Sequence, residues 1–385
     1  MSLIAEIIDK QRRFFEAGAS RSIPYRKAAL KKLSAAISSY ESEILQALAD
    51  DLGKSAFESV ATEISYVQSE ITHTLKHLGR WSASESRSVG LASFPAKAKV
   101  IKDPYGVTLH IAPWNYPFQL SLTPLVSAIA AGNTVVLKPS EYSEKTSQLL
   151  KRIVEEVFDP SHVSVVLGDA QTSTELLSHS WDYIFFTGSV GVGKIVAKAA
   201  AEHLTPVTLE LGGKSPCVVD GTAPLQKTAR RIVWGKFLNC GQTCIAPDYV
   251  LVKSEHKDAL IQALIEEIEK AFGDDAQNSK DYGHIIHEKH FKKLEADLKN
   301  QKTIYGGKTV AKELFFGPTL VDNPAMDSSL IQDEIFGPIL PILSYDTLED
   351  IDEVLTELKN PLAFYVFSQN KKFINTLIQN YPFGG

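Results

Sequence analysis

A cysteine in the second half of the sequence has neighbours that suit a chemical nucleophile. Cys244 ends the segment Asn-Cys-Gly-Gln-Thr-Cys at residues 239–244, with a glycine and two polar residues ahead of it. A thiol attacks a carbonyl carbon only as thiolate, so a catalytic role requires surroundings that favour the charged sulfur. The segment therefore predicts covalent chemistry at this sulfur.

A base must accompany such a nucleophile, and Glu210 is the best candidate. It lies in Leu-Glu-Leu-Gly-Gly-Lys at residues 209–214. The apolar neighbours predict burial, which would suit the carboxyl group to general-base work. A thiol and a base together indicate a reaction that passes through a thioester.

The remaining thiols fit structural roles. Cys217 lies in a strand-like run and is expected in the core. Cys240 precedes Cys244 with a spacing typical of neither a zinc ribbon nor a thioredoxin motif. We expect a packed neighbour, while a disulfide to Cys244 under oxidation stays open. Three cysteines are an odd, low number, which indicates free thiols and a cytoplasmic protein.

Histidine spacing gives two further patterns to weigh. His73 and His77 are spaced to share one helix face, and His284, His287 and His290 recur at every third position. A zinc site needs more ligands than either group shows, and no HExxH pattern is present. Both groups are expected to be polar helix surfaces, and no metal is expected.

Bulk properties limit the possible functions. The 385 residues suggest two domains, and 44% hydrophobic with 22% charged residues is typical of a globular protein. A net charge of −6 argues against a nucleic-acid partner. The sequence has no apolar run of about 18 residues, so it predicts no membrane-spanning segment. The acidic start of the sequence is unlike a signal peptide.

The order of predicted elements indicates an α/β protein. Helical periodicity covers about the first eighty residues. Alternation then predicts a first parallel sheet from strands at 107–112, 134–137, 163–167, 183–187 and 207–211. A second series has strands at 217–220, 249–253, 339–345 and 364–367. Helices are expected between them, at 120–131, 143–157, 172–179, 192–204, 225–238, 255–272, 289–302 and 348–358.

These elements predict two Rossmann-like parallel-sheet domains. We expect residues 1–82 and 106–211 in the first and 212–385 in the second, so Glu210 and Cys244 would face each other across one cleft. Residues 83–105 include an alternating, lysine-bearing run. That run is either an ordinary edge strand or a small β arm that pairs with another subunit.

Several unusual segments follow the strands of the first domain, where parallel sheets bind ligands. Asn115 stands between two prolines, and a rigid amide there could donate to an oxyanion. Lys138 and Glu141 could contact ribose or phosphate. Residues 187–193 place glycines in the order G-x-x-G-x-G before a helix, a weak phosphate signal by itself. Residues 333–338 could equally be a plain loop or a carboxylate and ring that grip a flat cofactor.

Together the segments resemble the NAD(P)-dependent aldehyde dehydrogenase superfamily. The resemblance is carried, in the family's order, by residues 113–117, 138–141, 186–189, 209–214, 241–244 and 334–338. The short N-terminus and the form of residues 239–244 resemble the class 3 branch. That branch implies dimers acting on medium-chain, fatty and aromatic aldehydes, with an acid as product.

The resemblance also implies a role for each matched residue. Cys244 would attack the aldehyde and form a thiohemiacetal and then a thioester, Asn115 would hold the oxyanion, and Glu210 would activate water. Tyr116 would contact the substrate. NAD or NADP would be held by Trp114, Lys138, Glu141, Thr187, Gly188, Ser189, Val190, Gly191, Val192, Gly193, Glu334 and Phe336.

Three points stay open. Glu141 would repel the 2′-phosphate of NADP while Lys138 would attract it, so the cofactor choice is not fixed. Family members continue past residues 382–385, so the catalytic domain is expected to be C-terminally incomplete, and a homodimer is expected if the full C-terminus is present. The alternatives are a CoA-acylating relative, against which Glu210 argues, and an inactive nucleotide-binding relative.

Overall fold

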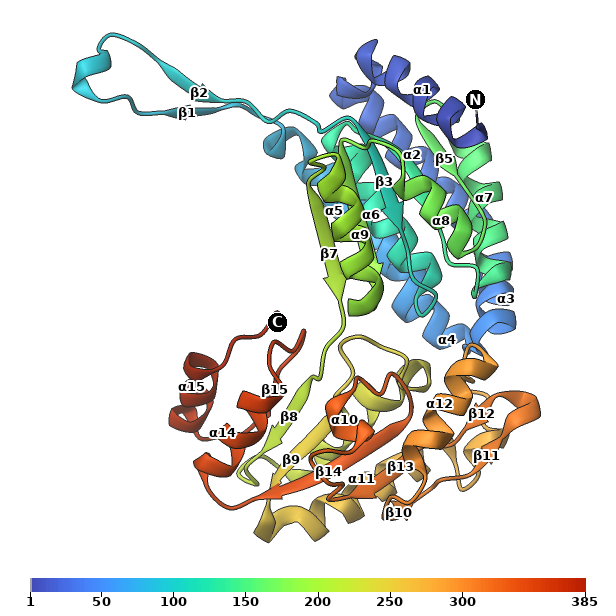
Figure 1. Ribbon diagram of the computed structural model, residues 1–385, viewed down its shortest axis with the longest axis vertical. Coiled ribbons are helices and arrows are strands. Elements are labelled where there is room, and N and C mark those ends of the chain that lie inside the picture. Colours follow the sequence, from blue (N-terminus) through green and yellow to red (C-terminus); the bar gives the residue numbers. More distant parts are fainter. Residues whose placement is uncertain (1) are drawn as a thin grey trace. The chain divides into compact units, whose positions relative to one another are not determined.

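The chain forms two compact units, which the computed structural model describes over residues 2–385 (Figure 1). The first unit contains the chain up to Leu48 together with Ser59–Glu210. The second contains Ala49–Glu58 and Leu211–Gly385. Both are α/β structures, as the alternating sequence pattern predicted.

The first unit is built on a five-stranded sheet in the order β5-β4-β3-β6-β7. Its strands are β3 (Val107–Ile111), β4 (Thr134–Lys138), β5 (Val163–Val165), β6 (Tyr183–Gly188) and β7 (Val207–Leu211). β3 pairs in parallel with both β4 and β6. The chain adds β4 and β5 on one side of β3 and then crosses to β6, so the connections change direction between β3 and β6.

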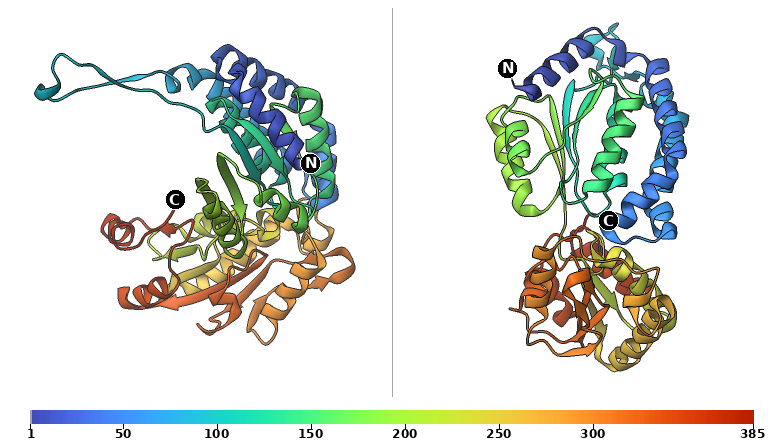
Figure 2. Two further views of the ribbon diagram at one scale, coloured as in Figure 1. Left: turned by 45° about the horizontal axis from the view of Figure 1, so that its top comes forward. Right: turned by 90° about the vertical axis from the view of Figure 1, so that its right-hand side faces the viewer.

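Helices cover both faces of this sheet, with α7 on one side and α9 on the other (Figure 2). The helices of this unit are α1 (Leu3–Glu16), α2 (Ile23–Ser39), most of α3 (Glu41–Leu52), α5 (Ser65–Trp81), α6 (Pro117–Ala131), α7 (Glu144–Val157), α8 (Ala170–Leu177) and α9 (Val190–Glu202). The end of α3 and nearly all of α4 (Ala56–Ser59) belong to the second unit. α6 begins with a proline and ends at Gly132, whose φ of 97° lies in the left-handed region. Buried residues of α2, α5, α6 and α7 form the main core with β4 and β5.

A two-stranded ribbon extends from the first unit (Figure 1). It consists of β1 (Glu85–Arg87) and β2 (Ala98–Val100), paired antiparallel. Between them, Leu91 is 95% exposed and Phe94 is 80% exposed. Apolar side chains at the tip of a ribbon are unfavourable in water, so they suit contact with another surface.

The second unit has a six-stranded sheet in the order β10-β13-β14-β9-β8-β15. Its strands are β8 (Pro216–Val219), β9 (Tyr249–Lys253), β10 (Thr303–Tyr305), β13 (Thr319–Asp322), β14 (Ile339–Tyr345) and β15 (Tyr365–Phe367). All neighbours are parallel except β10, which is antiparallel to β13. β11 (Thr309–Val310) and β12 (Phe315–Phe316) form a separate ladder.

The helices of the second unit are α10 (Leu225–Phe237), α11 (Lys257–Phe272), α12 (Glu288–Leu298), α13 (Ser329–Gln332), α14 (Leu348–Glu357) and α15 (Lys371–Asn380). α10, α11 and α12 contribute buried residues to one core with β9 and β14. Within residues 2–385, no helix has the length and apolar character required to cross a bilayer.

Candidate functional site

Three of the predicted ligand segments meet at the carboxyl edge of the first unit's sheet. Residues 113–117 follow β3, Lys138 ends β4, and residues 187–193 follow from the end of β6. These three strands are adjacent and parallel. The edge includes the change of direction between β3 and β6, which is where open α/β sheets bind ligands.

Lys138 and Glu141 form one paired group at this edge. The Lys138 ammonium is 2.8 Å from a carboxylate oxygen of Glu141. Lys138 is buried while Glu141 is exposed. The pair therefore presents a carboxylate at the surface with a cation held behind it, an arrangement that can accept hydrogen bonds from ribose hydroxyls.

The turn from β6 into α9 offers backbone to a ligand. Ser189 caps the helix, its hydroxyl accepting from the Val192 N–H at 3.4 Å. A Cβ added to Gly188 would lie 2.6 Å from the Phe186 ring, whereas one on Gly191 would meet nothing within 4 Å. Val190 and Val192 are both exposed beside this open space. The turn thus fits a pyrophosphate, which needs close backbone approach at a helix N-terminus.

The segment after β3 is fixed from behind by a carboxylate that the sequence interpretation overlooked. Glu63 is fully buried and accepts from the N–H groups of Phe118 and Gln119, at 3.0 and 2.8 Å. It thereby satisfies the first turn of α6. Asn115 and Tyr116, immediately before this turn, are themselves buried, and Trp114 is partly buried. The sequence signal that could have identified Glu63 is an acidic residue within the apolar stripe of a helix.

Glu210 differs from expectation. It is the penultimate residue of β7, the edge strand beside β6, and its side chain is exposed. The apolar run around it had predicted burial, and that prediction is wrong. At a sheet edge, the apolar neighbours of a residue on the strand do not ensure that the residue itself is covered.

The second unit uses the other edge of its sheet. Residues 212–214 lead into β8, residues 239–248 lead into β9, and residues 333–338 lead into β14. These strands are adjacent and parallel. The segments that carry Cys244, Glu334 and Phe336 therefore meet at the amino ends of the strands.

Asp248 ties these three segments together, and sequence reasoning missed it. Its carboxylate is 2.7 Å from the Lys214 ammonium and 3.6 Å from that of Lys236. It also accepts from the Ile335 N–H at 3.2 Å. Asp248 and both lysines are buried, so each charge depends on the others for compensation.

Glu334 lies over the glycines that precede β8. A Cβ on Gly212 would be 2.2 Å from a Glu334 carboxylate oxygen, so a side chain there would displace the Glu334 carboxyl group. Burial, reinforced by the negative charge of Asp248, raises the pKa of Glu334 to about 7, while the Gly213 N–H, Lys214 and Lys236 act against the rise. Its carboxyl group therefore changes charge near neutral pH.

The loop before Cys244 has an unusual backbone. Asn239, Cys240 and Gly241 have φ values of 52°, 55° and 74°, all in the left-handed region. The Gln242 side chain holds this bend by donating to the carbonyls of Asn239 and His284 at 3.1 and 3.0 Å. Its amide oxygen accepts from the Ile286 N–H at 3.0 Å. A left-handed run in non-glycine residues is costly and is found where function requires a fixed loop.

Access separates the three cysteines, all of which lie within residues 2–385. Cys244 is partly exposed, whereas Cys217 and Cys240 are buried. Burial raises the pKa of Cys217, and it raises that of Cys240 to about 12. The Tyr365 hydroxyl donates to the carbonyl of Ile245 at 2.6 Å, which fixes the loop on the far side of Cys244. Only Cys244 can meet a solute without rearrangement of the core.

The histidine patterns have local structural partners. His287 caps α12 by accepting from the His290 N–H at 3.0 Å. His290 is half-buried and donates to the carbonyl of Phe336, so its ring has a structural partner in addition to the expected polar surface. In the described part of the chain, no cluster of three or more metal-ligating side chains forms.

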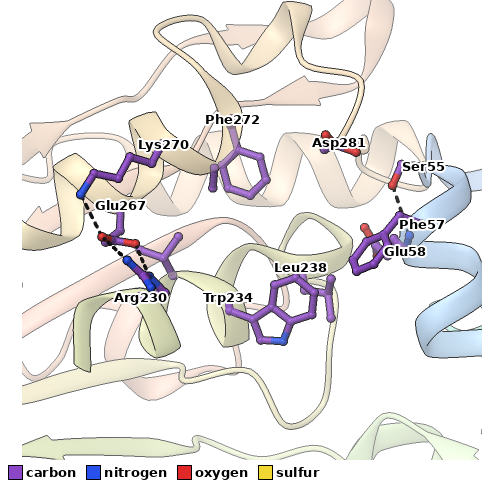
Figure 3. A pocket seen from close by; sticks show the side chains of 12 residues that line it. Ser55, Phe57, Glu58, Arg230, Trp234, Leu238, Glu267, Lys270, Phe272 and Asp281 are labelled. Atoms are coloured by element: carbon purple, nitrogen blue, oxygen red, sulfur yellow. Dashed lines mark hydrogen bonds and ion pairs between the residues drawn. The ribbon is translucent and has the colours of Figure 1, made fainter. Parts of the chain in front are cut away.

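A hollow of about 640 Å³ lies in the second unit beside α10 and α11 (Figure 3). Phe57 and Trp234 meet edge to face at its wall, with ring centroids 6.5 Å apart, and Leu238 lies beside them. At its rim, Arg230 is 2.9 Å from Glu267. The apolar wall suits a hydrocarbon group rather than a charged ligand.

Known proteins share both the sequence and the fold. The Aldehyde dehydrogenase family matches residues 2–385. A Staphylococcus aureus 4,4'-diaponeurosporen-aldehyde dehydrogenase is 43% identical over all of this chain and 84% of its own length. Human aldehyde dehydrogenase family 3 member B1 is also 43% identical, over all of this chain and 82% of its own.

Two solved structures and one further relative support the same family. The substrate-bound state of Staphylococcus aureus AldH has a TM-score of 0.98 at 43% identity, over all of this chain and 84% of its own. A rat relative, 40% identical over all of this chain and 85% of its own, is named dimeric and NADP-preferring. A Staphylococcus aureus betaine aldehyde dehydrogenase was solved with NAD+, at TM-score 0.88 and 26% identity over 99% of this chain and 78% of its own.

The resemblance seen in the sequence is thus confirmed, including its class 3 character. With a matching family, a matching fold and relatives named for one reaction, this chain belongs to the aldehyde dehydrogenase family and is an NAD(P)-dependent oxidoreductase.

Proposed function

We propose that Cys244 is the nucleophile of this aldehyde dehydrogenase. The observation that carries the proposal is that Cys244 is the one partly exposed thiol of the three, on a loop fixed by Gln242 and Tyr365. Its thiolate adds to the aldehyde carbon and forms a thiohemiacetal oxyanion. The Asn115 amide and the backbone N–H of Cys244 donate to that oxyanion.

The cofactor binds at the carboxyl edge of the first unit's sheet. Lys138 and Glu141 hold the adenosine ribose, the turn at residues 187–193 holds the pyrophosphate, and Trp114 packs nearby. Glu334 and Phe336 grip the nicotinamide end. NAD(P)+ held by these residues would supply the hydride acceptor for oxidation of the thiohemiacetal carbon. The open space at Gly191 and the exposed Glu141 carboxylate support this placement.

Glu210 completes the reaction by removing a proton from water, which attacks the thioester carbon. The acid leaves and the Cys244 thiolate is restored. The exposure of Glu210 supports its access to water. A base placed in this way favours hydrolysis over transfer of the acyl group to CoA.

The aldehyde is an apolar one, of the medium-chain, fatty or aromatic kinds. Trp234 and Leu238 belong to α10 and to the turn that leads directly into the Cys244 loop, and both line the apolar hollow. Tyr116 contacts the substrate from the first unit. A hydrocarbon tail placed against this wall would leave the carbonyl group free for the thiol.

The first test asks whether the reaction depends on the Cys244 thiol. Cys244→Ala should lower aldehyde-dependent cofactor reduction by at least about a thousandfold while leaving NAD+ binding intact, since Cys244 is not among the residues proposed to hold the cofactor. Iodoacetamide should inactivate the wild type with one modified residue, Cys244, because Cys217 and Cys240 are buried. Activity in Cys244→Ala, or inactivation that tracks another residue, would disprove the assignment.

A second test isolates the base. Glu210→Gln should keep a rapid first turnover of reduced cofactor and slow acid release by about a hundredfold, because a general base contributes about that much. Stopped-flow absorbance with decanal or benzaldehyde measures both phases. Equal acid release by the two proteins would remove this role, and turnover that needs CoA would favour the acyl-transferring alternative.

We also propose a cytoplasmic homodimer whose β1–β2 ribbon contributes to the subunit contact. Leu91 and Phe94 at the ribbon tip support contact with a second copy. The three unbridged thiols support a reducing compartment. The double variant Leu91→Ser with Phe94→Ser tests the role of the ribbon in the subunit contact. Sedimentation should show loss of dimers, and activity per folded chain is measured alongside.

A further inference from the structure

The first turn of α12 contacts the proposed nicotinamide loop through His290. Its Nε2 donates to the Phe336 carbonyl at 2.7 Å, and the two rings meet edge to face at 6.4 Å. A carbonyl only accepts, so the proton must reside on Nε2. Burial lowers the pKa of His290 to about 4, so the ring stays neutral and this tautomer persists at physiological pH.

Phe336 needs such support because its backbone is strained. Its φ of 53° lies in the left-handed region, which a bulky side chain rarely adopts. The next residue is also held by α12, since a Cβ on Gly337 would be 2.7 Å from the Leu294 side chain. One helix therefore fixes both the direction of the Phe336 ring and the course of the chain after it.

The same chain segment reaches the nucleophile loop by backbone contact. A Cβ on Gly241 would lie 2.3 Å from the Gly337 carbonyl oxygen, so the two main chains touch. On the other side, the Gln242 side chain bonds to His284 and Ile286, just ahead of α12. The Cys244 loop is thus held between the start of α12 and the loop that His290 supports.

We propose that His290 is a positioning residue that sets the spacing between the Cys244 loop and the Phe336 loop. It acts through the Phe336 carbonyl and the contact of Gly337 with Gly241. The inference rests on the proposed function, since it assumes that Phe336 faces the cofactor and Cys244 the aldehyde. Without the donor, the Phe336 carbonyl loses this hydrogen bond, which helps to hold Phe336 in its left-handed conformation.

The experiment separates the hydrogen bond from the bulk of the ring. His290→Leu removes the donor at similar volume, whereas His290→Gln keeps a donor at the end of a side chain of similar reach. Asp297→Asn removes an ion pair with Lys293 in the same helix, 2.7 Å long, without touching Phe336. It is the matched control for lost α12 stability.

Two readouts need no turnover. One is the NAD+ dissociation constant by calorimetry, and the other is the rate at which iodoacetamide alkylates Cys244 without cofactor. His290→Leu should weaken NAD+ binding and shift the alkylation rate, each by about tenfold, as expected for the loss of one partly buried hydrogen bond. His290→Gln should stay within about threefold of wild type, because it can restore the bond. Asp297→Asn should lower the melting temperature and change neither constant.

Two results would overturn the inference: wild-type constants in His290→Leu, or equal changes in Asp297→Asn, which would reduce His290 to a general stabiliser of α12. Failure of the proposed function would look different. In that case the wild type itself would not bind NAD+, or complete alkylation of Cys244 would leave turnover intact.

Discussion

The two units have the same architecture and use it in opposite ways. In the first, the proposed cofactor residues follow the carboxyl ends of β3, β4 and β6. In the second, the residues proposed for chemistry precede the amino ends of β8, β9 and β14. Parallel sheets favour ligands at the carboxyl edge, so the second unit departs from the general preference.

The difference lies in how each edge is held. At the carboxyl edge, a helix N-terminus and glycine turns present backbone N–H groups to a ligand. At the amino edge of the second unit, Asp248 joins the segments through buried ion pairs with Lys214 and Lys236. The residues proposed for chemistry thus lie at the less favoured edge, where buried ion pairs, rather than backbone dipoles, hold the segments in place.

The largest expected effect on the contrast between the two edges comes from removing the negative charge of Asp248. Asp248→Asn removes the carboxylate that pairs with the buried Lys214 and Lys236, and it should cost the second unit about 3 kcal/mol of unfolding free energy. Urea denaturation measures the loss. Hydrogen exchange should rise in residues 212–219 and 330–345 and stay unchanged in β3 and β4.

Asp258→Asn, at an exposed position of α11, is the control for a lost surface charge and should change stability by less than about 0.5 kcal/mol. If exchange rose equally in the first unit after Asp248→Asn, the charge cluster would not be a local device of the second unit.

The next test uses pH. Because the pKa of Glu334 is raised to about 7, its carboxyl group is mostly neutral at pH 6 and mostly ionised at pH 8. An ionised carboxylate accepts ribose hydroxyls better, so NAD+ affinity should rise about tenfold between these pH values. For folding the sign is opposite: this group's contribution to stability declines from about pH 4.5 to pH 7, where only the folded state keeps the proton.

Glu334→Gln should flatten the rise in affinity, as measured by calorimetry at each pH. Burial lowers the pKa of the neighbouring Lys236 to about 8, so a rise that persists in Glu334→Gln and vanishes in Lys236→Met would transfer the effect to the lysine.

The smallest expected effect concerns the carboxyl edge. Gly191→Ala has open space for its methyl group and lies in the first turn of α9, so it should raise stability by about 0.5 kcal/mol. The same methyl group should weaken NAD+ binding, because it occupies the space proposed for pyrophosphate. Thermal melts and calorimetry together test these opposite signs.

Gly188→Ala is the contrasting variant. Its methyl group meets the Phe186 ring inside the protein, so stability and binding should both fall. If Gly191→Ala bound NAD+ more tightly than the wild type, the cofactor would not occupy the space beside Gly191. The proposed contrast between the carboxyl edge and the amino edge would then fail.

Much of the fold could be predicted from sequence because strands and helices alternate with clear breaks. β7, β9 and β14 have the predicted bounds. The elements β10 to β13 are two to four residues long and give no periodic signal. α15 was missed although Asn370 caps its start by accepting from the N–H groups of Lys372 and Phe373.

Candidate site residues could be named from the sequence where one local segment carries the signal, as with Cys244 and Lys138, and their roles stay predictions. Residues were missed where their partners are distant in sequence. Glu63 reaches the start of α6 across 55 positions, and Asp248 reaches Ile335 across 87. Neither contact leaves a pattern within any short window. The wrong expectation for Glu210 arose because apolar neighbours do not reveal whether a strand lies at an edge.

The contact between Gly241 and Gly337 is made by main-chain atoms. Neither glycine has a side chain that could be shortened or lengthened, so substitutions at positions 241 and 337 cannot adjust this distance gradually. A redesign toward other aldehydes could vary Trp234 or Leu238 at the wall of the hollow and leave this backbone contact beside the Cys244 loop unchanged.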